Sequence, residues 1–374
     1  MTRHRALLGA VVAAGLVAVL IVLLRTQLEP VPEPERASPE PSVYALEFAD
    51  LRHGYALRER CDAQARCGNE LLVTEDGEHW LTRALPTAEV PPAGDRSGLL
   101  FVLGPDRVAL GDFAEPAGPG RAAAKWYSAD SGRTWRQVPE STGESVESIP
   151  AGGILQAQCV GIGESCVQSR LAVMRPDSGS TAVLANQPAL KLMRVGPAPS
   201  ADGGWWVLGL LADKAGTGVA VSHDAGRSWS VAELPGVVYN PAPVDMDARA
   251  GMAYVAMATG PGRGLATLVA ICRSTDGGRS WALMWLRSGG DGEPDTLDGV
   301  PVAAADGSLE VHTNAGLSFR TTGYGPARIR FSLEGSSGGH VRRTGAGYLS
   351  QSTTRPNAYA LSADGLTWTS ISIP

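Results

Sequence analysis

Three copies of one octapeptide bring Asp, Ser and Arg side chains close together in this chain of 374 residues. They read SADSGRTW (128–135), SHDAGRSW (222–229) and STDGGRSW (274–281). An Asp can serve as a general acid or base, a Ser as a nucleophile and an Arg as an anion-binding group. The octapeptide is therefore either a catalytic signature or a turn that the fold repeats.

The spacing of further copies favours the repeated turn. Four weaker copies read TEDGEHW (74–80), RPDSGSTA (175–182), HTNAGLSF (312–319) and SADGLTW (362–368). Together the seven copies recur about every 47 residues, and some have lost the Asp or the Trp. A pattern that tolerates these losses indicates a structural unit.

The residue types suit a hairpin turn. Gly adopts positive φ without steric cost, and an Asp carboxylate accepts hydrogen bonds from turn N–H groups. The Trp then buries its ring at the start of the next strand, while Arg133, Arg227 and Arg279 are expected to face solvent. The residues that we assign to these structural turns are Asp76, Gly77, Trp80, Ser128, Asp130, Gly132, Trp135, Asp177, Gly179, Ser222, Asp224, Gly226, Trp229, Ser274, Asp276, Gly278, Trp281, Asn314, Gly316, Phe319, Asp364, Gly365 and Trp368.

The stretches between the turns read as short strands. In the fourth unit GGWWVLGLLAD is followed by GTGVAVSHDAGRSWSVAEL, and the chain is rich in turn formers, with 46 Gly and 26 Pro. Four short strands per unit at this period predict an all-β fold, a β-propeller of seven four-stranded blades. Six blades are the alternative, because the sixth unit is short.

The repeats resemble Asp boxes, also called bacterial neuraminidase repeats, which occur in sialidases, sortilin-type receptors, xyloglucanases and photosystem-II assembly factors. The resemblance covers roughly residues 44–374. It implies a sialidase-like propeller whose boxes lie on peripheral turns, with any activity on the opposite face. Fold resemblance alone does not imply a function.

The resemblance also implies which residues a sialidase would need. These are an Arg-Ile-Pro motif, three Arg for the substrate carboxylate, a Tyr nucleophile with a Glu, and an Asp acid/base. Residues 43–73 hold Arg52, Arg58, Arg60 and Arg66 but no Arg-Ile-Pro. Tyr324 or Tyr348 could be named as the nucleophile, with Glu334 near in sequence, but no motif around them supports that role. We therefore expect a chain without the sialidase catalytic motifs.

Other catalytic or metal sites find little support in the sequence. Glycosidases of other types need two facing carboxylates, and the candidates occupy turn-like stretches: Asp245, Asp247, Asp291, Glu293 and Asp295. The segment SGGDGEPDTLDG (288–299) is rich in oxygen ligands but lacks the EF-hand order. We assign no catalytic residue, metal or cofactor.

The N-terminus predicts a membrane anchor. Residues 6–24 are 19 uncharged, mostly apolar residues, long enough to cross a bilayer as a helix. Arg3 and Arg5 precede them, which favours a cytoplasmic N-terminus. A cleaved signal peptide is the alternative. The predicted divisions are a cytoplasmic segment (1–5), a transmembrane anchor (6–24), a Pro/Glu-rich linker (25–42) and the propeller (43–374).

The five Cys have a pattern of their own. Cys61 and Cys67 flank five residues, Cys159 and Cys166 flank six, and Cys272 stands alone. Outside the cytoplasm such close pairs can form disulfides. We expect Cys61–Cys67 and Cys159–Cys166 bonds on the turns opposite the boxes, and a buried free Cys272.

These observations predict a membrane-anchored, monomeric propeller in a bacterial envelope, outside the cytoplasmic membrane. Its expected role is a non-catalytic binding or assembly scaffold for a protein or a glycan. A divergent sialidase-like glycoside hydrolase is the alternative. Nucleic acid is not an expected partner, because the net charge is -6 and no basic stripe is present.

Overall fold

The computed structural model describes residues 42–62, 66–87, 99–111, 124–138, 143–160, 168–196, 198–236, 242–249, 251–259, 267–289, 293–322, 330–335, 339–352, 355 and 357–374. The chain divides into two compact units, Met1–Glu40 with Cys61–Arg66, and Pro41–Arg60 with Cys67–Pro374. In the first unit, the Arg66 side chain donates to Asp62 (Nε to Oδ2, 2.7 Å). The predicted anchor and most of the linker lie outside the described residues.

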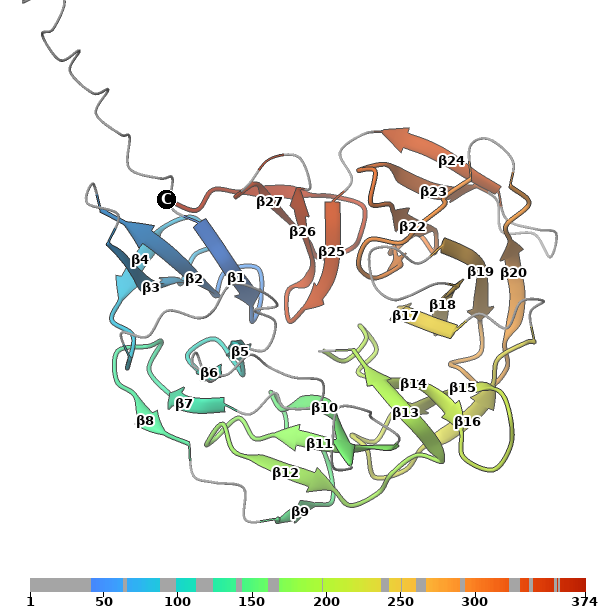
Figure 1. Cartoon of the computed structure of the whole chain (residues 1–374), viewed down its shortest axis with the longest axis horizontal. Coiled ribbons are helices and arrows are strands. Elements are labelled where there is room, and N and C mark those ends of the chain that lie inside the picture. Colours follow the sequence, from blue (N-terminus) through green and yellow to red (C-terminus); the bar gives the residue numbers. More distant parts are fainter. Residues whose placement is uncertain are drawn as a thin grey trace, which may run out of the picture. The chain divides into compact units, whose positions relative to one another are not determined.

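The second unit is a ring of seven four-stranded sheets, and its described residues contain no helix (Figure 1). Seven blades are therefore confirmed over six. No helix within the described ranges is long and apolar enough to span a bilayer. The strands of the first four blades are β1 (Ser42–Phe48), β2 (Gly54–Cys61), β3 (Cys67–Thr74) and β4 (Trp80–Arg83); β5 (Leu100–Val102), β6 (Val108–Gly111), β7 (Ala124–Ser128) and β8 (Arg136–Gln137); β9 (Ser145–Val146), β10 (Ile154–Val160), β11 (Gln168–Met174) and β12 (Thr181–Leu184); and β13 (Leu190–Val195), β14 (Trp205–Leu211), β15 (Thr217–Ser222) and β16 (Ser230–Glu233).

The last three blades complete the ring. Their strands are β17 (Ala242–Arg249), β18 (Met252–Thr259), β19 (Thr267–Ser274) and β20 (Ala282–Leu286); β21 (Val302–Ala303), β22 (Leu309–His312), β23 (Ser318–Thr322) and β24 (Arg330–Gly335); and β25 (Gly339–Thr344), β26 (Gly347–Ser352), β27 (Tyr359–Ser362) and β28 (Thr369–Ile371). In six blades, neighbouring strands are antiparallel and follow one another in chain order.

Strand β14 is apolar at nearly every position because both of its faces are covered by neighbouring blades. On β14, Trp205 and Val207 pack into a core that includes Leu155 and Leu171 of the third blade. The alternate residues Trp206 and Leu208 pack into a core shared with the fifth blade. A strand with two buried faces reads as a continuous apolar run, which explains the sequence GGWWVLGLLAD.

The third blade departs from the regular strand order. Its sheet runs β10-β11-β12-β9, so the first strand in chain order pairs with the last, in parallel, through Val183↔Ser145 and Leu184↔Val146. Figure 1 shows β10 toward the middle of the ring and β9 at its rim. After β9 the chain must therefore cross the blade inward to reach β10. We call residues 147–153 the crossing segment.

The ring closes between the first and seventh blades without a shared sheet. Each of the two blades takes its four strands from one contiguous part of the chain. Gly345 N donates to Phe48 O (3.0 Å), and Tyr359 OH donates to Val43 O (3.4 Å). Apolar side chains of both blades form one core that includes Leu46 and Leu361. Side-chain packing thus joins the ends of the ring.

Candidate functional site

In the intact copies of the repeated turn, the Asp carboxylate accepts hydrogen bonds from other residues of the same turn. Asp130 Oδ1 accepts from Ser128 Oγ (2.8 Å) and Thr134 N (2.9 Å), and its Oδ2 accepts from Thr134 Oγ1 (2.6 Å). The turns at 222–229 and 274–281 repeat these contacts. These carboxylates hold a turn together and have little accepting capacity left for a substrate.

The acidity of these carboxylates follows from the same bonds. Partial burial acts to raise the pKa of Asp130, but the bonds from Thr134 and Ser128 outweigh it and lower the pKa to about 2. For Asp224 the bonds from the side chain and backbone of Ser228 lower the pKa to about 2. Both groups therefore remain ionised in the folded protein above about pH 2.

In the three intact copies, the Trp of the turn contacts the blade before its own. Trp135 Nε1 donates to Ala84 O (3.1 Å), and Trp229 Nε1 donates to Asn186 O (3.0 Å). The Trp281 ring meets Trp206 edge to face, with 6.3 Å between centroids. Gly278 has φ +88, and a Cβ on it would lie 2.6 Å from the Trp206 ring. The repeated residues therefore serve blade packing.

The two shorter copies keep the same arrangement. Asp364 Oδ1 accepts from Ser362 Oγ (3.1 Å) and Thr367 N (2.8 Å). In the copy at 74–80, His79 occupies the place of the hydroxyl residue and contacts Asp76 (Nδ1 to Oδ2, 2.7 Å). That bond raises the pKa of His79, and bonds from the backbone of His79 and Glu78 hold the pKa of Asp76 well below its usual value.

The segment 312–319 lies in a different place from the other copies. It joins β22 to β23, the second and third strands of its blade, whereas the other six join the third and fourth strands in chain order. His312 Nδ1 contacts Ser318 Oγ directly (3.1 Å), and Asn314 N donates to Thr296 Oγ1 (3.1 Å). The sequence grouped this segment with the others because its short-range pattern is similar, although its position in the blade is not.

The residues nominated for glycoside chemistry do not form an accessible pair. Asp247 is buried and accepts from Arg343 Nη1 (2.7 Å), Tyr348 OH (2.5 Å) and Ala303 N (2.7 Å). Tyr348 is completely buried, and burial together with the charge of Asp247 raises its pKa far above the usual value. Because Tyr348 stays protonated and out of solvent, it cannot attack a sugar at its present position.

The other nominated residues are dispersed. Glu293 accepts from Ser288 N (2.9 Å) and Oγ (3.0 Å) of its own loop. Asp245 accepts from Met246 N (2.9 Å), and Asp295 from Thr296 Oγ1 (3.3 Å). Tyr324, Asp291 and the side chain of Glu334 lie outside the described residues. Each of the three described carboxylates accepts a hydrogen bond from a residue at most five positions away in the chain.

Of the Arg residues nominated near the first repeat, Arg58 is buried and engaged. Its Nη2 contacts Glu70 Oε2 (2.5 Å), and its Nη1 also contacts the Pro374 carbonyl. Arg66 pairs with Asp62 in the first unit. Both guanidinium groups are therefore used within the protein.

The cysteines follow the predicted pattern where they are described. Cys61, Cys67 and Cys159 are in disulfide bonds, and Cys166 lies outside the described residues. β2 ends at Cys61, β3 begins at Cys67, and Cys159 lies near the end of β10. The bonded cysteines thus occupy strand ends at turns of the kind opposite the repeated turns. Cys272 is free and buried, as expected, and burial raises its pKa to about 12.

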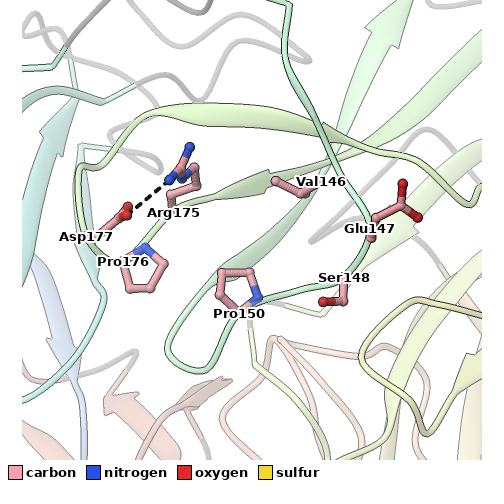
Figure 2. Close-up of a pocket in the computed structure, with 7 residues that line it drawn as sticks. All are labelled: Val146, Glu147, Ser148, Pro150, Arg175, Pro176 and Asp177. Carbon is pink, nitrogen blue, oxygen red and sulfur yellow. Dashed lines mark hydrogen bonds and ion pairs between the residues drawn. The ribbon is translucent and has the colours of Figure 1, made fainter.

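A cavity of about 470 Å³ lies where the third blade departs from the regular order. Figure 2 shows its two walls. The residues of one wall come from the turn between β11 and β12, and those of the other come from the end of β9 and the crossing segment. The lining residues are Arg175, Pro176 and Asp177 on the first wall, and Val146, Glu147, Ser148 and Pro150 on the second.

The turn wall is a repeated turn that has changed its bonding. Arg175 replaces the first Ser, so Gly179 N donates to the backbone carbonyl of Arg175 (2.8 Å) instead of to a hydroxyl. Ser178 Oγ accepts from Ser180 N (3.3 Å), as the carboxylate of Asp276 accepts from Arg279 N in its own turn. Asp177 accepts from Ser178 Oγ (3.0 Å) through Oδ1 and pairs with Arg175 Nη2 (3.1 Å) through Oδ2 at the cavity.

Both walls are braced by neighbouring blades. Tyr127 OH donates to Pro176 O (2.7 Å), which fixes the turn wall to the second blade. Ile149 N donates to Ala225 O (2.7 Å), which fixes the crossing segment to the fourth blade. Gly152 has φ +80, and a Cβ on it would lie 2.6 Å from Leu103 O. The cavity is thus preformed, a property that lowers the entropic cost of binding.

Sequence reasoning placed Asp177 and Gly179 in a structural turn and missed the other cavity residues. The available signal was the irregularity of RPDSGSTA, which has Arg175 in place of Ser and Ala182 in place of Trp. No comparable signal marked Glu147 or Ser148. Their place at the cavity depends on the outward position of β9, which local sequence does not reveal.

Comparisons with known proteins yield structural neighbours only. No family model and no curated protein matches the sequence. The structure of YCF48 bound to a D1 peptide is 13% identical, with a TM-score of 0.45 over 85% of this chain and 89% of that chain. The GH74 xyloglucanase from Xanthomonas campestris is 15% identical, with a TM-score of 0.40 over 90% and 68%.

The intramolecular trans-sialidase from Ruminococcus gnavus, in complex with oseltamivir carboxylate, is a further neighbour. It is 15% identical, with a TM-score of 0.35 over 90% of this chain and 94% of that chain. Identities and scores of this size carry no conclusion about function. The propeller assignment rests on the strand order described above.

Proposed function

We propose that this chain is a binding or assembly scaffold, a membrane-anchored β-propeller outside the cytoplasmic membrane that engages a protein or a glycan without catalysing a reaction. The anchor is the apolar segment 6–24, and the propeller would face the envelope of a bacterium. The repeated turns would be Asp boxes, whose role here is to pack the blades. The third-blade cavity would be one contact point for the partner.

The observation that carries the proposal is the engagement of Tyr348 and Asp247. Among the described residues considered for glycoside chemistry, this tyrosine and this carboxylate contact each other. They do so in a buried network that connects three blades. Asp247 comes from the fifth blade, Ala303 from the sixth, and Arg343 and Tyr348 from the seventh. A network of this kind supports a rigid ring, whereas a reactive site needs access to substrate.

The alternative, a divergent sialidase-like hydrolase, is tested by scoring turnover and binding separately. The full chain in detergent micelles is incubated with a fluorogenic sialoside and a glycan panel, and in parallel with envelope proteins under chemical cross-linking. We expect no release of the fluorophore and a specific cross-linked protein or a retained glycan. Sustained turnover that is lost when the domain is unfolded would establish the hydrolase instead.

A further inference from the structure

We propose that the third-blade cavity accepts a Lys or Arg side chain of a partner protein. This inference rests on the proposed function and specifies the chemistry of the partner. The cavity combines an apolar centre with the carboxylate of Glu147 on one wall, which is not paired with a cation among the described residues. The walls are those of Figure 2, the turn that holds Arg175 and the crossing segment that holds Glu147.

The charge balance of the cavity favours a cation. Arg175 is already neutralised, because its Nη2 contacts Asp177 Oδ2 (3.1 Å) and its Nη1 contacts Glu144 Oε2 (3.5 Å). Glu147 on the facing wall is exposed, and it makes no hydrogen bond or ion pair with any described residue. Two of the three charged lining residues are acidic. An added anion would have to displace a carboxylate from Arg175, whereas a cation finds Glu147 unpaired.

The apolar lining suits the stem of a basic side chain. Val146 and the rings of Pro150 and Pro176 line the cavity between the charged groups. Lys and Arg bury their methylene stems on such surfaces while the charged head stays near water or a carboxylate. Ser148 lines the same wall and offers a hydroxyl acceptor. The cavity volume of about 470 Å³ leaves room for backbone on either side of one such side chain.

Two departures from the repeat coincide at this cavity in the third blade. In the intact turns the Asp accepts from the turn hydroxyls and N–H groups, whereas Asp177 pairs with Arg175 at the cavity. This ion pair and the inward passage of residues 147–153 occur together in the third blade. Both departures from the repeat contribute residues to one cavity.

The test uses the full chain in detergent micelles and three fluorescein-labelled hexapeptides that differ at one position, Ala-Ala-Pro-Lys-Ala-Ala and its Glu and norleucine counterparts. Fluorescence anisotropy measures binding at low and high salt. We expect saturable binding of the Lys peptide, weaker at high salt, with at least tenfold weaker binding of the other two. Glu147→Gln should weaken binding of the Lys peptide at least tenfold.

Glu78→Gln is the matched control, since Glu78 is an exposed glutamate on a repeated turn of the first blade. It makes the same change of charge and should leave binding unchanged. The inference is overturned if the Lys peptide does not bind, if Glu147→Gln and Glu78→Gln bind alike, or if the Glu peptide binds in a manner that Arg175→Gln abolishes. The scaffold proposal is tested separately from this inference. It stands if a partner protein is still cross-linked to the Glu147→Gln variant, and it is overturned if the chain hydrolyses a glycoside.

Discussion

The turns at 128–135 and 175–182 are copies of one pattern that differ in what their carboxylates do. Asp130 is held by Ser128 and Thr134 within its turn, and the adjacent Trp135 packs onto the preceding blade. Asp177 pairs with Arg175 at a cavity, and Ala182 stands where the Trp would be. A complete copy of the turn packs neighbouring blades together. The copy at 175–182 lacks the first Ser and the Trp, and it lines a cavity instead.

The largest expected effect comes from removing the aromatic ring of an intact turn. Trp281→Ala should lower the free energy of unfolding by about 3 kcal/mol, because the ring packs edge to face on Trp206 between two blades. Denaturant unfolding followed by fluorescence measures this loss. A loss below about 1 kcal/mol would show that the Trp does not hold the blades together. The replacement of this Trp by Ala182 in the third blade would then not explain why that turn differs.

The two carboxylates should differ in their contribution to stability. Asp130→Ala removes three accepted hydrogen bonds, so we expect a loss of about 1–2 kcal/mol in the free energy of unfolding. Asp177→Ala removes an exposed ion pair and an exposed bond from Ser178 Oγ, and should cost roughly 0.5 kcal/mol or less. The two variants are compared by urea unfolding under identical conditions. Equal losses would contradict the idea that Asp177 stabilises its turn less than Asp130 does.

Acid should act on the intact turns through the same carboxylates. The pKa of Asp130 and Asp224 is about 2 in the folded protein and 3.8 as a free side chain, so their contribution is present above about pH 4. It is lost as the pH falls through about 2, when both groups become protonated. Unfolding midpoints recorded between pH 5 and 2 should fall less steeply for Asp130→Ala than for the unaltered protein. Parallel curves would argue against these bonds.

The smallest effect concerns His79, which replaces the hydroxyl residue in the turn at 74–80. Its bond to Asp76 raises the pKa of His79, so this contact stabilises the fold at low pH and its contribution fades as the pH rises through the raised pKa. An NMR titration should place the imidazole pKa above 6.5, and Asp76→Asn should return it toward that value. An unchanged titration in Asp76→Asn would assign the shift to another cause.

Much of the fold could be predicted from the sequence because its signals are local. The turn at 274–281 closes through contacts between residues at most four apart, such as Ser280 N to Asp276 Oδ1. The strand at Trp205–Leu211 is apolar on both faces because both are covered. Interactions of such short range leave a direct pattern in the chain, and its period of about 47 residues predicted seven blades, although the segment 312–319 is a different turn of its blade.

The cavity could not be predicted in this way, and neither could the place of the segment 312–319. Ser145–Val146 pairs with β12, which begins at Thr181, although β10 begins much nearer in the chain, at Ile154, and both edges offer the same backbone groups. Likewise, a turn of similar composition can join any two successive strands of a blade. The sequence by itself determined the blade, its turns and their number, because these follow from hydrogen bonds and side-chain alternation within a few residues. Only the tertiary structure decided that Glu147 and Arg175 line one cavity, because that depends on which sheet edge the strand before Glu147 takes.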